Sequence, residues 1–104
     1  IKSWQPCTNT KALIKDCSAA KPFEFWVNFL EGRFAVHCDT EEKAKCFLME
    51  CSERGLTWQM GTNPTKYTFF ETNGRNTCYR YYGKKIEHGS VDYFKSIDYK
   101  IVEY

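Results

Sequence analysis

The sequence predicts an α+β domain with a largely antiparallel sheet and helices packed on one face. Apolar residues recur at helical spacing in the first half of the chain, and in the second half they fall in short runs separated by turn signals. The 104 residues suit a single domain over 1–104. Within it we expect an N-terminal helical segment at 1–31 and an α+β core at 33–104.

Two helices are expected in the N-terminal segment. Thr8 or Thr10 can cap a short helix that ends near Cys17. Pro22 suits the first turn of the second helix, and Gly32 suits its carboxyl-terminal cap. The residues at helical spacing that this helix is expected to bury are Phe23, Trp26, Val27 and Leu30.

The strongest helix pattern begins at Asp39. With Glu42 three residues later, Asp39 forms an acidic variant of the capping box, and Glu41 adds negative charge to the first turn. The helix dipole explains both glutamates, so they do not indicate a catalytic carboxylate pair. Gly55 is expected to end the helix. Its expected buried face consists of Ala44, Phe47, Leu48 and Cys51.

Residues 33–38 alternate as a strand. Phe34, Val36 and Cys38 then share one face, and His37 points to the other. His37 and Cys38 therefore cannot form the base–nucleophile pair that thiol catalysis needs. No glycine-rich phosphate loop, dinucleotide motif or serine elbow occurs in the chain. We expect no catalytic residues and no cofactor.

Short strands and turns are predicted in the second half of the chain. Residues 56–58 begin a short strand, and 60–66 have the composition of a loop. The segments 67–71 and 77–82 flank Asn73-Gly74, the strongest short turn signal, which predicts a β-hairpin between them.

A second tight turn is expected at Gly83-Lys84, leading into a strand over 85–88. Ser90 can then cap a short helix. A last strand over 99–104 closes the predicted fold.

The redox state of the cysteines is left open by the sequence. An even number in a short chain is typical of a disulfide-stapled secreted protein. Against this, Cys46 and Cys51 fall in the strongest helix pattern, and the chain has enough apolar residues for a core, so buried free thiols are favoured. Metal binding is least favoured, because no C-x-x-C pair occurs. The six are Cys7, Cys17, Cys38, Cys46, Cys51 and Cys78.

Basic and aromatic residues mix between positions 75 and 85, where we place the candidate partner-binding residues. They are Arg75, Arg80, Tyr82, Lys84 and Lys85. Tyr and Arg are favoured at protein interfaces, and the same residue types stack on bases and hold phosphates. Cross-strand packing of tyrosines under arginine stems is a third interpretation. The sequence leaves all three open.

The net charge of +2 is too small to predict nucleic-acid binding by itself. No stretch resembles a secretory signal, and none approaches the roughly 18 apolar residues of a membrane span. The first residue is Ile1 rather than Met, so the sequence does not say what precedes it.

Two stretches of the chain resemble small proteins from phages, prophages and mobile elements of low-GC Gram-positive bacteria. They read NFLEGRFAVHCDTEEKAKCFLMECSERGLTW at 28–58 and NTCYRYYGKKIEHGSVDYFKSIDYKIVEY at 76–104. In that group a strand ending in VHC, a TEEEA-type helix, a G-x-x-W step, a TCY strand and a closing YGS…YY…GY.IIEF segment recur in this order. The likeness covers about residues 25–104, and the cysteines at 46 and 51 depart from it.

Some such accessory proteins inhibit host defence, including anti-CRISPR proteins that bind Cas nucleases. The resemblance therefore implies a protein of the bacterial host cytoplasm that inhibits a Cas-type nuclease by occupying its surface, without catalytic residues, cofactor or metal. A small nucleic-acid-binding module is the alternative function, and a secreted disulfide-rich protein is a further one.

Overall fold

The computed structural model describes residues 21–104. The helix expected to end near Cys17 lies outside this range. In chain order the elements, with η marking a 3-10 helix, are α2 (Phe23–Leu30), β1 (Phe34–His37), α3 (Glu41–Glu53), η1 (Pro64–Lys66), α4 (Phe70–Asn73), η2 (Gly74–Asn76), β2 (Thr77–Tyr82), β3 (Lys85–Ser90), α5 (Val91–Ser96) and β4 (Lys100–Glu103).

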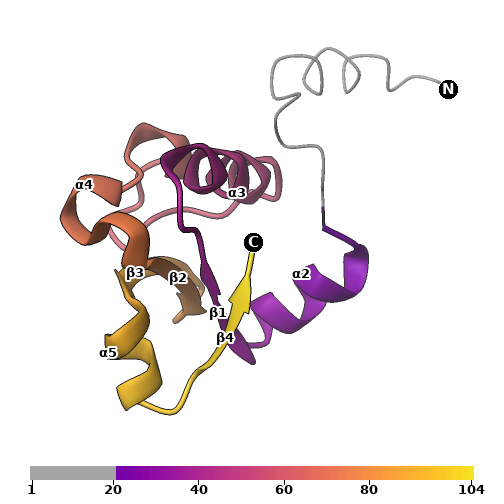
Figure 1. Ribbon diagram of the computed structural model, residues 1–104. Helices are drawn as coiled ribbons and strands as arrows, with labels where there is room; N and C mark the ends of the chain where they lie inside the picture. Colours follow the sequence, from indigo (N-terminus) through magenta and orange to yellow (C-terminus); the bar gives the residue numbers. More distant parts are fainter. Residues whose placement is uncertain (1–20) are drawn as a thin grey trace, which may run out of the picture.

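The strands form one mixed sheet in the order β3-β2-β1-β4 (Figure 1). β2 pairs antiparallel with β1 and β3, while β4 runs parallel to β1. The α+β class and the mostly antiparallel sheet are therefore confirmed. The two longer helices, α2 and α3, lie on one face of the sheet as expected, and the short α5 packs on the opposite face.

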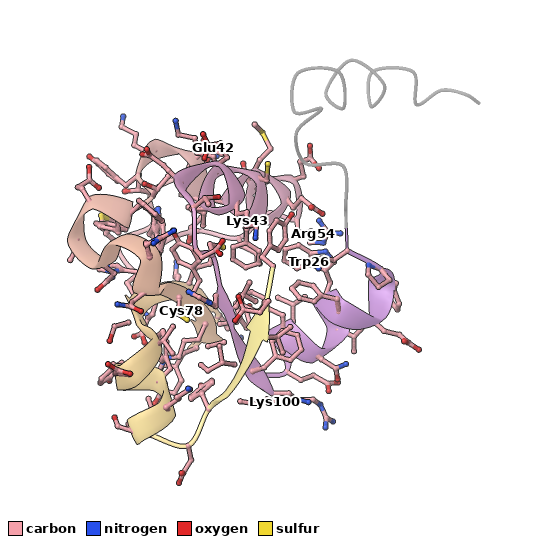
Figure 2. The ribbon with its side chains drawn as sticks, in the orientation of Figure 1. Trp26, Glu42, Lys43, Arg54, Cys78 and Lys100 are labelled. Carbon is pink, nitrogen blue, oxygen red and sulfur yellow. The ribbon has the colours of Figure 1, made fainter. Side chains whose placement is uncertain are left out.

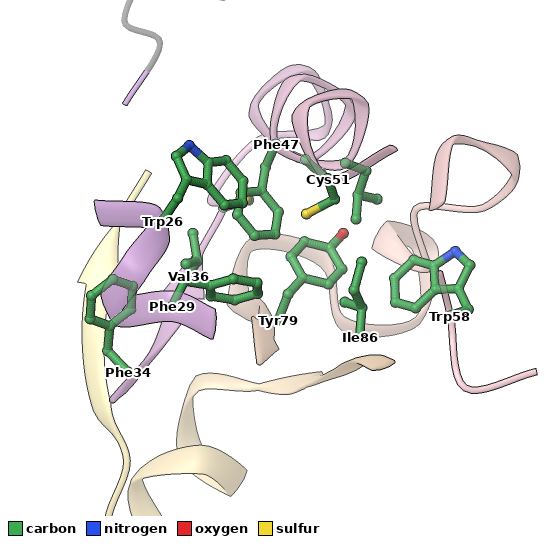
Figure 3. Close-up of a cluster of buried hydrophobic side chains, with 12 residues drawn as sticks. Trp26, Phe29, Phe34, Val36, Phe47, Cys51, Trp58, Tyr79 and Ile86 are labelled. Carbon is green, nitrogen blue, oxygen red and sulfur yellow. The ribbon is translucent and has the colours of Figure 1, made fainter. Parts of the chain in front are cut away.

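The main core lies between the sheet and the two longer helices. Strand alternation turns Val36 of β1 and Tyr79 of β2 toward this face, where both are fully buried. The Phe47 ring from α3 stacks on Tyr79 at a centroid distance of 5.5 Å and on Trp26 from α2 at 5.4 Å (Figure 3). These rings connect α2, α3 and β2. Large aromatic side chains such as these account for much of the apolar surface that a small core buries.

A smaller core lies under α5 on the opposite face. Ala35 of β1 and Cys78 of β2 pack there against Phe94. Gly89 is needed on β3, because a Cβ atom at that position would come within 3.0 Å of the Phe94 ring. The predicted cap is confirmed, since the Ser90 hydroxyl accepts a hydrogen bond from the Tyr93 backbone N–H. Since α5 has only 6 residues, part of this sheet face stays open to solvent.

The helix α2 begins at Phe23, with Pro22 as its N-cap residue rather than in its first turn as predicted, and its buried residues also differ from the predicted set. Trp26 and Phe29 are buried, whereas Phe23 is 81% exposed. Glu24 and Asn28 mark the solvent side of this helix, but its apolar side is wider than the face that is buried, and the contacts of Trp26 and Phe29 with Phe47 of α3 select the buried part. The guanidinium of Arg54, at the end of α3, lies 4.0 Å from the centre of the Trp26 ring (Figure 2).

The helix α3 buries the face predicted for it, but its cap is Thr40 rather than Asp39. Thr40 has the extended backbone of a cap residue, and its hydroxyl accepts a hydrogen bond from the Lys43 backbone N–H. Asp39 instead forms an ion pair with the Lys43 ammonium at 3.0 Å. Glu41 and Glu42 occupy the first turn as expected.

The hairpin predicted across Asn73-Gly74 is wrong. Residues 70–73 form α4 and residues 74–76 form η2. Phe69 has a left-handed backbone, with φ 57°, and turns the chain into α4. Since β1 and β3 occupy both edges of β2, no further strand can pair with it.

The turn predicted at Gly83-Lys84 is confirmed and joins β2 to β3 directly. The strand predicted at 56–58 is reduced to one bridge between Trp58 and Ile86. The Ile86 backbone N–H donates to the Thr57 carbonyl beside this bridge. This short segment therefore covers the outer edge of β3 without adding a full strand.

Candidate functional site

The β2–β3 hairpin carries four of the five predicted partner-binding residues. Gly83 and Lys84, with φ 61° and 67°, form the left-handed pair of a type I′ turn. Lys84 is exposed within the turn, and Tyr82, just before it, is 56% exposed. Lys85 is partly buried, with its Nζ 3.3 Å from the Thr57 hydroxyl. We call residues 82–85 the hairpin tip.

Arg80 is held inside the domain rather than offered to a partner. Its Nη2 lies 2.6 Å from a carboxylate oxygen of Glu87, directly across from it on β3. The guanidinium also lies 4.3 Å from the centre of the Tyr82 ring and 5.2 Å from that of Tyr99. With its side chain only 12% exposed, Arg80 fixes the orientation of Tyr82. Of the three interpretations given for the basic and aromatic residues, cross-strand packing of an arginine on a tyrosine is the one that fits Arg80.

Arg75 lies apart from the hairpin tip. It belongs to η2, before β2 begins, whereas Lys84 follows the end of β2. A strand rises about 3.3 Å per residue, so β2 separates the two by roughly 20 Å. The predicted residues therefore form no single patch, and Arg75 belongs to a different corner of the sheet.

That corner is built around His37, which sequence reasoning considered only beside Cys38. Its Nδ1 lies 2.7 Å and 2.9 Å from the two carboxylate oxygens of Glu103, and its Nε2 lies 2.6 Å from the Arg75 carbonyl oxygen. Glu103 is 66 residues away in the sequence. Parallel pairing of β1 with β4 brings the two together, and no local pattern in the sequence signals that pairing.

The corner borders a shallow hollow of about 480 Å³ on the open sheet face. Besides His37 and Glu103, its walls include Asn76, Lys95 and Tyr99. Both ring nitrogens of His37 already contact oxygen atoms of the protein, so neither is free to act on a bound molecule.

The free thiols are poorly placed for nucleophilic chemistry. Cys38, Cys51 and Cys78 are free and fully buried. Burial raises the pKa of Cys38 and Cys51 well above its ordinary value and that of Cys78 to about 12. All three are therefore protonated near neutral pH. Cys46 is disulfide-bonded, which corrects the expectation of a free thiol there.

His88 packs against aromatic rings instead of a nucleophile. Its ring stacks on Phe69 at a centroid distance of 4.0 Å, and Trp58 meets it edge-on at 6.1 Å. Burial lowers the pKa of His88, so the imidazole is neutral near neutral pH.

A second hollow, of about 550 Å³, lies between α3 and residues 65–72, with the half-exposed Tyr67 on its wall.

Within residues 21–104, no cluster of three or more His, Cys, Asp or Glu could hold a metal ion. No helix in the same range is long and apolar enough to span a membrane. Comparison with known proteins found no matching family model, curated protein or solved structure.

Proposed function

We propose that this chain is a binding protein that acts by occupying the surface of another macromolecule, with Tyr82 at the centre of the contact. The observation that carries this proposal is the support under Tyr82. Its ring is 56% exposed, yet Arg80 stacks on it and is itself ion-paired with Glu87. An exposed aromatic ring that is already held in place loses little conformational freedom on binding. Such residues are typical interface hot spots.

The partner is proposed to be a host defence nuclease, inhibited by steric occupation of its surface. This part of the proposal is supported by the resemblance to phage and prophage accessory proteins over residues 25–104. The partner is expected to have a pocket that receives the Tyr82 ring. Because the exposed ammonium of Lys84 lies close to Tyr82 in the hairpin tip, acidic residues are expected around that pocket. A standard interface buries roughly 800 Å² on each partner, which a domain of this size can supply.

A protein partner is favoured over nucleic acid by the way the basic residues are engaged. Arg80 is neutralised by Glu87, and Lys85 is partly buried against Thr57. Arg75 lies at another corner, so Lys84 is the one cation of the hairpin tip that is exposed rather than partly buried. Tight binding to a phosphate backbone draws on several such cations acting together.

Affinity capture from a host lysate at low and high salt tests the proposal. The immobilised wild-type chain is expected to retain a nuclease at both salt concentrations, and the purified chain is expected to inhibit DNA cleavage by that nuclease. Recovery of nucleic acid alone, lost steeply at high salt, would instead indicate the nucleic-acid-binding module. Recovery of no macromolecule would contradict both functions.

A further inference from the structure

The imidazole of His37 bridges two segments that are distant in the sequence. Its Nδ1 contacts the Glu103 carboxylate on the carboxyl-terminal strand β4, and its Nε2 contacts the Arg75 carbonyl in η2. The His37 carbonyl also accepts a hydrogen bond from the Tyr104 backbone N–H at 3.0 Å. The same residue therefore ties both its main chain and its side chain to the end of the polypeptide.

The chemistry of these contacts selects one protonation state. A backbone carbonyl can only accept a hydrogen bond, and so can an ionised carboxylate. Both nitrogens of His37 must then donate, which only the doubly protonated imidazolium can do. The distances of 2.6 Å and 2.7 Å are those of charge-assisted hydrogen bonds.

The charged groups around His37 come from several elements. Glu103 on β4 pairs with it directly, and Asp39 follows β1 but is itself ion-paired with Lys43 of α3. Lys95 of α5 and Tyr99 face it across the hollow. On β2 the neighbouring residue in the sheet is Cys78, a buried thiol that stays protonated near neutral pH. The carboxylates next to the ring thus favour its charged form.

We propose that His37 is a pH-sensitive clip: its imidazolium form links the carboxyl-terminal strand β4, through Glu103, to η2, through the Arg75 carbonyl. Loss of one ring proton leaves either Nδ1 facing the Glu103 carboxylate or Nε2 facing the Arg75 carbonyl without a hydrogen to share. The clip then releases one of the two segments. The hollow beside the ring gives water access to the site, so that the proton can exchange with solvent.

The direction of the pH effect follows from the environment of the ring. Burial lowers the pKa of His37, but the hydrogen bond to the Arg75 carbonyl and the Glu103 carboxylate outweigh it, so that the pKa lies above its ordinary value of 6.5. The stabilisation is therefore complete below about pH 6.5 and is lost as the pH rises through the folded-state pKa. His88 has the opposite shift, so its contribution is lost as the pH falls.

Nuclear magnetic resonance on the wild-type chain tests the clip without any substitution. The His37 ring is expected to titrate above pH 6.5, with both nitrogens protonated at pH 6, while His88 titrates below pH 6.5 in the same sample. A His37 ring that titrates at or below the pH of His88, or that is a single tautomer at pH 6, would overturn the proposal.

Amide hydrogen exchange with two variants tests the link to β4. After correction for intrinsic exchange, the protection of the β4 amides is expected to fall several-fold between pH 6 and pH 8 in the wild type and to stay constant in His37→Gln. In Glu103→Gln, which changes a side chain that is 66% exposed and is therefore expected to keep the fold, the His37 pKa is expected to drop. An unchanged His37 pKa in Glu103→Gln, or an equal loss of protection in His37→Gln, would contradict the clip.

Discussion

The guanidinium of Arg80 lies 4.3 Å from the centre of the Tyr82 ring, two residues along the same face of β2. Arg80 is in turn ion-paired with Glu87 across the β2–β3 pair. The arginine that appeared from the sequence to be a binding residue thus supports the tyrosine that is exposed. The proposed binding surface is therefore smaller than the patch predicted from the sequence, and its exposed ring, Tyr82, is supported by Arg80 from within the domain.

Replacing Arg80 by methionine tests this support. The change removes the ion pair from the partly buried Glu87 carboxylate and leaves it only the hydrogen bond from the Gln59 amide, so we expect a loss of about 2 kcal/mol in the free energy of unfolding. Lys84→Met removes an exposed cation on the same hairpin and should change stability by less than about 0.5 kcal/mol. Urea unfolding of the two variants measures the difference. Equal losses would contradict the internal role of Arg80.

The type I′ turn predicts opposite effects for substitutions at its two central residues. Gly83 has φ 61°, and a Cβ atom added there would meet no other atom within 4 Å, so Gly83→Ala should cost about 1 kcal/mol through backbone strain alone. Lys84 carries a side chain at φ 67°, so Lys84→Gly should stabilise the fold by about 0.5 kcal/mol. Thermal unfolding should therefore move in opposite directions. A shift of both variants in the same direction would argue against this turn.

Tyr79 provides a test of the corrected path of the chain before β2. Its hydroxyl donates to the Thr68 carbonyl, a contact that depends on the turn at Phe69 and would not exist in the hairpin predicted from the sequence. Tyr79→Phe should lower the free energy of unfolding by about 1 kcal/mol. Tyr81→Phe, on the same strand and face, should have little effect. Equal stability of the two variants would contradict the Thr68 contact.

Alkylation mapped by mass spectrometry tests the state of the cysteines. Cys38, Cys51 and Cys78 should resist iodoacetamide in the folded chain and react after denaturation without reductant, because burial keeps them protonated and out of reach. Cys46 should react only after reduction, because it is disulfide-bonded. Alkylation of all six cysteines after denaturation alone would contradict the disulfide, and with it the secreted disulfide-rich alternative.

Sequence patterns predicted correctly those helices, caps and turns whose formation depends on residues close together in the chain. The buried stripe of α3, the Ser90 cap and the turn at Gly83-Lys84 all depend on residues within one or two turns of each other, and all are confirmed. The false hairpin at Asn73-Gly74 had an equally strong turn signal. It failed because β2 has only two edges, and both are used by strands that the turn signal does not reveal.

The contacts of the candidate site that could not be predicted from the sequence depend on pairing between strands that are distant in the chain. The His37–Glu103 contact depends on β4 returning parallel to β1 after the α5 crossover, a pairing with no signature at either strand. The buried state of Arg80 depends on Glu87, whose facing position follows only once the register of the β2–β3 hairpin is known. In α2 the apolar side is wider than the buried face, so the contact with Phe47 of the neighbouring helix decides which apolar residues are buried.

The most direct test of the binding account compares two exposed tyrosines. Tyr82 at the hairpin tip and Tyr67 beside α3 are 56% and 47% exposed, so their truncation removes similar surface from different parts of the fold. Recovery of the host partner by immobilised Tyr82→Ala should fall roughly tenfold or more, while Tyr67→Ala should retain the partner as the wild type does. Full recovery by Tyr82→Ala, or an equal loss with Tyr67→Ala, would contradict the account.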